Sequence, residues 1–317
     1  MTAYVIQRIL LAVPVVLLVV TLVFLATHTP RFADFAVNRI CKGDPVQCEQ
    51  VRHELGLDKP LPEQYVRYVG GLLRGDLGDS ILTGRPVLLE LKDRLAPSIE
   101  LALLQLVVAL TLAMPIGIIS AIRQDTGLDY VLRLFAILWL AIPVFYLAVI
   151  ILIIVFKGLG WSPPLTTTAW RDFFEDPVEN LKMLAIPAVA GGLGLGAGMM
   201  RLLRSQMLEV LRQDFVRTAW AKGLREQTVI LRHVLKNAMI PVFTFAALMV
   251  GTVFSGEVIL ESMFSIPGIG LFSVMAVKNN DFPVAQGIVL VIAVALVFTN
   301  LVVDVAYGWL DPRIRYR

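Results

Sequence analysis

Six stretches of this chain contain no charged residue, and each is about as long as a helix that crosses a membrane. A helix of roughly 20 apolar residues spans a hydrocarbon core of about 30 Å. The six stretches are residues 9–27, 101–122, 134–156, 183–200, 237–256 and 282–303. Because a spanning segment must satisfy its backbone hydrogen bonds internally, the sequence predicts an all-α integral membrane protein with six transmembrane helices.

The composition supports this class and excludes others. Hydrophobic residues make up 57% of the 317 residues and charged residues 17%, and the mean hydropathy is +0.75. Soluble domains are about half apolar and about a quarter charged. The net charge of +3 is small and its basic residues are scattered, so nucleic-acid binding is not expected.

The fourth stretch is rich in glycine. Two pairs of glycines stand four residues apart, Gly192 with Gly196 and Gly194 with Gly198. Small residues at this spacing let membrane helices approach closely, so tight packing is predicted here. A phosphate-binding loop is excluded because no Gly-Lys-Ser or Gly-Lys-Thr follows.

The charges of the loops predict the orientation. The 201–236 loop has eight Lys and Arg against three acids, whereas the 157–182 loop has three bases against four acids. Basic loops face the cytoplasm, so both termini are predicted to be cytoplasmic. We expect an N-terminal transmembrane helix (1–27), a small extracytoplasmic insertion between helices 1 and 2 (28–100), a five-helix core (101–308) with the cytoplasmic loop 201–236, and a cytoplasmic tail (309–317).

The extracytoplasmic segment holds the two cysteines of the chain, Cys41 and Cys48. On the oxidising side of a membrane such a pair is typical of a disulfide, and the alternative is two free thiols. A zinc site is disfavoured because only His28 and His53 could contribute further ligands. Two short helices are predicted, at about 46–57 and 62–73. Residues 74–80 (Arg-Gly-Asp-Leu-Gly-Asp-Ser) form either a simple turn or a docking surface for an external protein.

The 201–236 loop is amphipathic. Its apolar residues recur at steps of three and four, with basic residues on the other side: Leu208, Leu211, Phe215, Ala219 and Trp220 against Arg212, Arg217 and Lys222. This pattern predicts one helix, followed by a turn at Gly223 and a second helix from about Val229. Such a unit would fit the groove of a soluble partner. An interfacial helix lying on lipid headgroups is the alternative.

Two segments of this loop are similar to a known motif. They are residues 217–224 (Arg-Thr-Ala-Trp-Ala-Lys-Gly-Leu) and 231–241 (Leu-Arg-His-Val-Leu-Lys-Asn-Ala-Met-Ile-Pro). Together they resemble the coupling loop of ABC importer permeases, in the dipeptide, oligopeptide and nickel branch. The general pattern is Glu-Ala-Ala, three residues, then Gly. Ala219 and Gly223 match it, whereas Arg217 and Thr218 replace Glu and the first Ala, as is usual in the peptide branch. Residues 56–65, 256–270, 281–283, 300–304 and 311–316 also resemble that branch, so the similarity runs from about residue 50 to the end.

The resemblance implies a fold, a function and partners. The fold would be the six-helix ABC importer permease type, and the chain would form the pathway for di- or oligopeptides by alternating access. Implied partners are a homologous second permease subunit, two cytoplasmic ATPase subunits that bind ATP and Mg, and an extracytoplasmic substrate-binding protein. This chain would bind no cofactor. The residues implied to contact the ATPase are Arg217, Thr218, Ala219, Trp220, Ala221, Lys222 and Gly223. Nickel chelates, glutathione or oligosaccharides are alternative cargoes within the same class.

Glu257 is the candidate residue for the substrate pathway, because an ionisable group near the end of a span is costly unless it is paired or faces water. The alternative is a solvated side chain at the outer headgroup level. The chain is not expected to be an enzyme, since its three histidines are dispersed and no phosphate-binding motif is present. An ion-coupled secondary transporter or channel is the main rival, but the six stretches lack the mid-span ionisable residues of that class.

Overall fold

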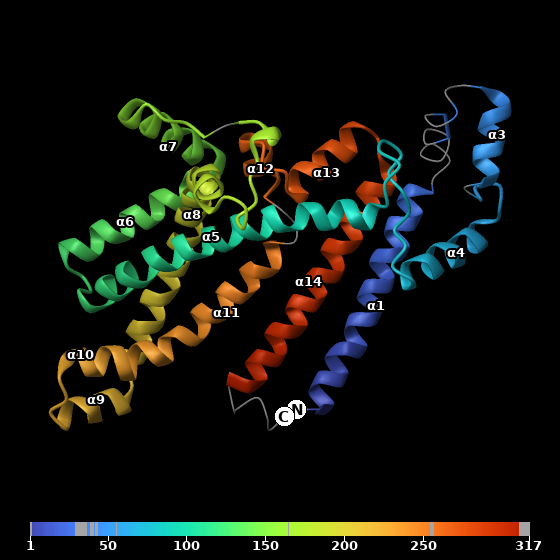
Figure 1. Ribbon diagram of the computed structural model, residues 1–317. Helices are drawn as coiled ribbons and strands as arrows, with labels where there is room; N and C mark the ends of the chain where they lie inside the picture. The colour runs from blue at the N-terminus through green and yellow to red at the C-terminus, as the bar shows by residue number, and fades with distance from the viewer. Residues whose placement is uncertain are drawn as a thin grey trace. The chain divides into compact units, whose positions relative to one another are not determined.

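The computed structural model describes residues 2–28, 37–38, 41, 44–54, 56–163, 165–253 and 257–310. In these ranges the regular secondary structure is helical, and the strand-like pairing is one isolated bridge between Asp79 and Pro86. Figure 1 shows the helices, which are α1 (Thr2–Thr27), α3 (Pro45–Glu54), α4 (Leu61–Leu73), α5 (Val87–Ile122), α6 (Gly127–Ala141), α7 (Val144–Leu159), η1 (Thr167–Ala169), α8 (Pro177–Leu211), α9 (Asp214–Ala221), α10 (Glu226–Thr228), the π-helix η2 (Val229–Leu235), α11 (Lys236–Val253), α12 (Val258–Phe264), α13 (Ile269–Lys278) and α14 (Phe282–Leu310). The predicted all-α fold is confirmed.

The apolar helices occupy the same parts of the chain as the predicted stretches, but not every stretch is one continuous helix. Within the described part, four helical segments are long and apolar enough to cross a membrane, or up to six if each of two bent helix pairs counts as one span. These four segments are residues 87–122, 177–211, 226–246 and 282–301, and the apolar part of α1 is shorter, at Leu10–Ala26. Residues 254–256, at the end of the predicted fifth stretch, and 311–317, in the predicted tail, lie outside the described residues.

The third predicted stretch is not a single helix. Residues 134–156 are divided between α6 and α7, whose axes differ by 108°. The break falls at Pro143, which has no N–H to donate to a helix. Proline also disfavours helical dihedrals at the preceding residue, and Ile142 has φ −82° and ψ 124°. The expectation of one continuous helix here was wrong because the effect of Pro143 outweighs hydropathy.

A second bent pair was not predicted from the sequence. Helices α12 and α13 meet at 84°. They have 7 and 10 residues, so each is too short to be found by a search for spans of about 20 apolar residues. Pro267 and Gly268 separate them.

The chain divides into two compact units. The first comprises Met1–Ser98, Phe254–Ser262 and Pro267–Val305, and the second comprises Ile99–Val253, Met263–Ile266 and Ala306–Arg317. The core of the first unit joins the start of α5 to α13 and α14 through Val87, Leu91, Ile269, Phe272, Ala276, Val284 and Ile288. In the second unit α8 packs against α6, α7 and α11.

The glycines of α8 allow close contact with α5, as predicted, but only one of the two pairs does so. A Cβ at Gly192 would lie 2.6 Å from the Cβ of Val108, and one at Gly196 would lie 3.2 Å from the Cα of Ala109. A Cβ at Gly194 would meet nothing within 4 Å. Gly192 and Gly196 therefore face α5, whereas the Gly194 pair does not form the close approach.

The two predicted helices of the 28–100 segment are confirmed as α3 and α4. The structure joins Cys41 and Cys48 by a disulfide, with a Cα–Cα distance of 5.0 Å. α4 packs on α1, where the Tyr65 ring meets the Phe24 ring edge-on at a centroid distance of 5.1 Å.

The 74–86 segment is a series of turns fixed at one point. The buried carboxylate of Asp281, between α13 and α14, accepts hydrogen bonds from the Ser80 hydroxyl and from the N–H groups of Ile81 (3.2 Å) and Leu82 (3.3 Å). Ser80 and Asp281 belong to two sequence blocks that are about 200 residues apart in the chain. Their contact gives both blocks a structural role, which is to hold this loop against α14.

Candidate functional site

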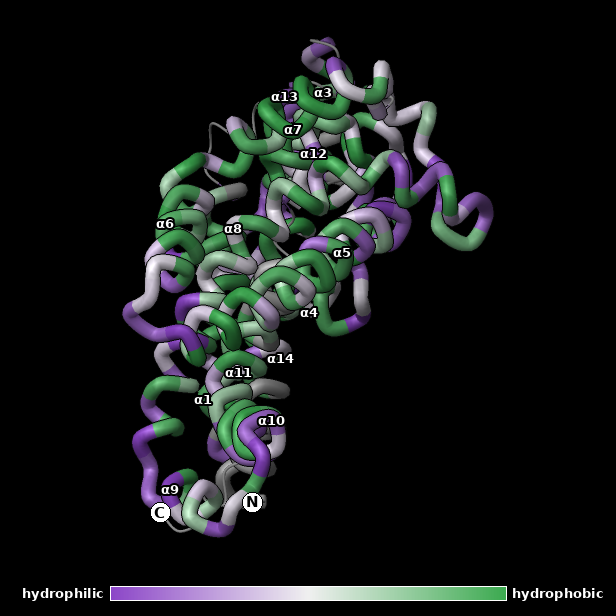
Figure 2. Tube along the Cα trace, turned by 90° about the vertical axis from the view of Figure 1, so that its left-hand side faces the viewer, coloured by the Kyte–Doolittle hydropathy of each residue, from purple (hydrophilic) through white to green (hydrophobic). Residues whose placement is uncertain are grey.

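The amphipathic loop forms a short helix, α9, between the end of α8 and the segment α10–η2–α11 (Figure 1). Asp214 begins the helix and supplies negative charge to its first turn, as the helix dipole favours. Figure 2 shows hydrophobic residues along α6 and α11 giving way to hydrophilic residues around α9. The structure thus presents a polar helix at the end of largely apolar ones, on the loop that the charge pattern predicts to be cytoplasmic.

The prediction of which residues form the buried apolar face of α9 was partly wrong. Val216 (0% exposed) and Ala219 (6%) are buried, whereas Phe215 (41%) and Trp220 (44%) are exposed. The prediction assumed one helix from Leu208 through Ala219. Instead α8 ends at Leu211, and Gln213 takes extended dihedrals (φ −77°, ψ 150°), so the helical phase is reset before α9 begins.

The buried side of α9 is packed into a core shared with α8, η2, α11 and α5. This core contains Ala121, Leu203, Met207, Val210, Val216, Ala219, Val229, Ile230, Val234, Ala238, Met239 and Val242. Each of these residues is at most 8% exposed. Because close-packed side chains resist displacement, α9 is rigidly attached to α8 and η2.

Gly223 ends α9 in a defined motif. Its N–H bonds to the carbonyl of Trp220 (2.9 Å), the N–H of Leu224 bonds to the carbonyl of Ala219 (3.4 Å), and Gly223 has φ +72°. This is the Schellman arrangement, which favours glycine because it requires the left-handed conformation. The predicted turn at Gly223 is confirmed.

The remaining predicted contact residues form the outer surface of α9. Arg217, Thr218, Ala221 and Lys222 are exposed. Arg217 pairs with Asp214 at 3.4 Å, but both side chains are well exposed, so the pair contributes little to stability. The guanidinium group of Arg217 and the ammonium group of Lys222 are accessible to an acidic or polar partner.

Three residues of the predicted apolar stripe line a pocket, although Leu208 and Leu211 also pack against the core described above. Leu208, Leu211 and Trp220 border a cavity of about 250 Å³ together with Ala121, Ile122, Gln124, Arg212, Glu226 and Ile230. The cavity is lined by residues from the ends of α5 and α8 and from α9, α10 and η2. It could accept an apolar side chain with polar groups at its rim.

The pathway candidate Glu257 lies immediately before α12 and is partly buried. Its N–H donates to the carboxylate of Glu261 (3.3 Å), which is fully buried. Glu261 also accepts from the Ser98 hydroxyl (2.7 Å) and from the Leu271 N–H (2.9 Å) at the start of α13. Glu261 therefore holds α12, α13 and the start of α5 together, and hydropathy and motif spacing gave no sign of this.

A second buried acid was also missed. Asp129, at the start of α6, is 0% exposed and forms a two-point ion pair with Arg204 of α8. In the sequence, Asp129 is visible only as an acidic residue shortly before an apolar stretch. Its partner Arg204 lies 75 residues further along the chain. No local pattern joins the two.

The comparisons with known proteins cover the whole chain. Residues 113–316 match the family model described as the binding-protein-dependent transport system inner membrane component. Residues 1–102 match the model of the N-terminal part of such membrane components.

Several curated proteins are similar over their full length. The chain is 36% identical to the glutathione transport system permease protein GsiC of Pectobacterium atrosepticum, with all of both chains covered. It is 35% identical to the dipeptide transport system permease protein DppB of Alkalihalophilus pseudofirmus, again with all of both chains covered. It is also 35% identical to the di/tripeptide transport system permease protein DppB of Pseudomonas aeruginosa, over 89% of this chain and 93% of that protein.

Proposed function

The chain belongs to the family of inner membrane components of binding-protein-dependent transport systems, and from this premise we propose that it is a permease subunit of an ATP-driven peptide importer. It is a multi-pass inner membrane protein. In this role it would form the translocation pathway for di- or oligopeptides and alternate between inward-open and outward-open states. Its two termini and the 201–236 loop would face the cytoplasm.

The observation that carries this proposal is the placement of α9. The helix has an exposed polar surface, while Val216 and Ala219 fix its other side to α8 and η2. A helix that only lay on lipid headgroups would direct its apolar face toward the bilayer. Here Val216 and Ala219 are packed in the protein's own core, whereas Phe215 and Trp220 are exposed on the same helix as Arg217. Aromatic residues and arginine are enriched at protein interfaces, which favours a protein partner on the outer surface.

Three kinds of partner follow from the proposal. Two ATPase subunits would bind ATP and Mg and dock on α9, a second homologous permease would complete the pathway, and a substrate-binding protein would deliver cargo from outside. Arg217, Thr218, Trp220, Ala221 and Lys222 would contact an ATPase, and this chain would hold no cofactor itself. Glu257, immediately before α12, would favour the amino terminus of a peptide.

Cargo assignment rests on the names of relatives. Two of the relatives above are named for dipeptide or di/tripeptide transport and one for glutathione. Since glutathione is itself a small peptide, the shared chemistry is a short chain with a charged amine and carboxylate. We therefore propose short peptides as the cargo class.

The test is uptake into proteoliposomes that contain the complete complex. ATP-driven accumulation of labelled dipeptides that requires the binding protein is the expected result, with glutathione and a free amino acid as competing cargoes. Accumulation driven by a proton or sodium gradient, without the ATPase subunits, would instead establish the rival class of secondary transporter.

A further inference from the structure

We propose that Asp129 and Arg204 are positioning residues that pin the N-terminal end of α6 to α8, so that α6 turns about this point when α8 moves. The proposal rests on the proposed function, because α8 is the helix that leads directly into α9. It assigns a transport role to two residues that lie outside α9 and outside the Glu257 region.

The ion pair between Asp129 and Arg204 is bidentate, and we call this contact the joint. Arg204 Nε lies 2.9 Å from Asp129 Oδ1, and Arg204 Nη2 lies 2.7 Å from Oδ2. A planar guanidinium bound at two points fixes direction as well as distance. Asp129 also accepts from the Ser120 hydroxyl of α5 and from the Asp125 N–H (3.1 Å), so its oxygens contact three helices or their turns.

The pair is shielded from water. The Asp129 side chain is 0% exposed and that of Arg204 is 15% exposed. Arg133, one turn further along α6, lies 4.0 Å from Asp129 Oδ1 and adds positive charge at the rim. Ion pairs on a solvated surface contribute little, whereas removing one member of a buried pair leaves an uncompensated charge.

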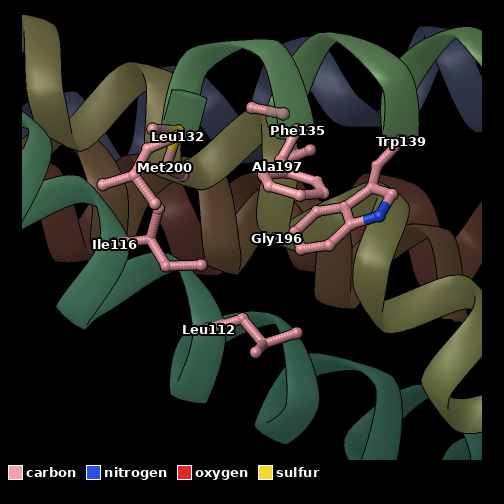
Figure 3. Close-up of a pocket in the computed structure, with 9 residues that line it drawn as sticks. Leu112, Ile116, Leu132, Phe135, Trp139, Gly196, Ala197 and Met200 are labelled. Carbon is pink, nitrogen blue, oxygen red and sulfur yellow. The ribbon is translucent and has the colours of Figure 1, made fainter. Parts of the chain in front are cut away.

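Beyond the pair, α6 packs on α8 through Ala136, which is 2% exposed and shares a core with Ala197 and Met200, but a pocket lies beside this contact. An apolar pocket of about 220 Å³ separates α5, α6 and α8, and its lining residues are Leu112, Ile116, Leu132, Phe135, Ala136, Trp139, Gly196, Ala197 and Met200. Figure 3 shows Phe135 and Trp139 directed from α6 toward Gly196 and Ala197 of α8, with Leu112 and Ile116 of α5 on the other side. This pocket leaves space beside Phe135 and Trp139 into which this part of α6 can shift.

The joint and the pocket are adjacent on all three helices. Ile116 precedes Ser120 by one turn of α5, Met200 precedes Arg204 by one turn of α8, and Leu132 follows Asp129 by three residues of α6. The pair therefore closes one end of the pocket. At the other end α6 stops at the Ile142–Pro143 break. A helix that is fixed at one end, borders a pocket along its length and is interrupted at its far end can turn about the fixed end.

Motion can reach this joint from α9. Leu203 and Met207, on the same helix as Arg204, belong to the core that buries Val216 and Ala219 of α9. In addition, a Cβ at Gly117 of α5 would lie 3.2 Å from the Met200 carbonyl, so α5 and α8 touch closely here. A displacement of α9 would thus move α8 and, through Arg204, the start of α6.

The test compares three variants in the reconstituted complex. Asp129→Asn removes one charge of the pair, and the double variant Asp129→Asn with Arg204→Met removes both, which often leaves stability unchanged. Glu179→Gln removes one member of the exposed Glu179–Lys182 pair of α8 and serves as the control. The measured quantity is cargo transported per ATP hydrolysed, together with the thermal unfolding temperature and the co-purification of the ATPase subunits.

We expect the double variant to assemble, to unfold at the wild-type temperature and to transport about fivefold less cargo per ATP. A pair that only stabilises the fold would leave that ratio at the wild-type value, and this result would overturn the proposal. Loss of ATPase co-purification from the wild type itself would count against the proposed function instead.

If the variants fail to fold, distances between spin labels in an otherwise wild-type complex test the proposal. Labels at Leu128 and Ser205 flank the pair, and a label at Leu140 marks the far end of α6. The 128–205 distance should stay constant between the nucleotide-free and ATP-bound states while the 140–205 distance changes. A change at 128–205, or constancy of both distances, would overturn the proposal.

Discussion

Larger residues are unfavourable at both Gly223 and Gly192, but for different physical reasons. Gly223 has a left-handed backbone with open space around the missing side chain, whereas Gly192 has helical dihedrals and no space. The first glycine can therefore be tested for function without disturbing a core. The second can be tested for packing without altering the backbone.

Gly223→Val should uncouple ATP hydrolysis from transport without preventing assembly. A Cβ on a backbone with φ +72° costs roughly 1–2 kcal/mol, which would displace the end of α9. The Cβ itself would meet no atom within 4 Å, so no core is disturbed at this atom. The ATPase activity of the reconstituted complex should lose its stimulation by the cargo-loaded binding protein. Gly158→Val, at an exposed helical glycine of α7 with open space, is the control, and wild-type stimulation in the Gly223 variant would contradict the expected role.

Gly192→Ala should destabilise the protein by about 1–3 kcal/mol, because the new methyl group overlaps Val108 of α5. Gly194→Ala, on the same helix, meets nothing within 4 Å and should be neutral or stabilising by up to about 1 kcal/mol. Thermal unfolding in detergent measures both. Equal effects of the two substitutions would show that helix propensity, not contact with α5, determines the outcome.

At the scale of elements, the lengths of the uncharged stretches and the positions of turn residues predicted the helices well. The errors occur where a single residue with non-helical dihedrals interrupts a helix. Pro143 divides the third stretch into α6 and α7, and the extended residue Gln213 separates α8 from α9. The pairing of Asp129 with Arg204 and of Ser80 with Asp281 could not be predicted, because each contact joins distant parts of the sequence. The position of helix α9 in the chain was predictable, but the residues that form its buried face were not.

Asp281→Asn should loosen the 76–86 loop. The buried carboxylate accepts one hydroxyl and two backbone N–H groups of residues 80–82, and weakening such bonds to a charged group costs about 1.5–3 kcal/mol. Faster amide hydrogen exchange at Ile81 and Leu82 is the expected result. Asp93→Asn, which breaks the exposed Arg85–Asp93 pair, is the control and should leave exchange at these two amides unchanged. Unchanged exchange in the Asp281 variant would show that other contacts hold the loop.

At the scale of the whole molecule, the chain combines helices that are long and apolar enough to cross a membrane with the amphipathic helix α9, which is packed against α8 and η2. The family match spans both compact units, so the membrane helices and α9 belong to one functional subunit. In this account the energy enters through a separate polypeptide that presses on α9, and α8 with η2 carries the displacement into the membrane helices.

The most direct test places the photo-reactive residue p-benzoyl-phenylalanine at Phe215, which is 41% exposed on α9. The same residue at Phe174, 94% exposed on the loop that is predicted to face outward, is the control. The account predicts that irradiation of native membranes links position 215 to an ATPase subunit in a nucleotide-dependent yield, and that position 174 gives no such product. Linkage of position 215 to lipid alone, or equal linkage from both positions, would contradict it.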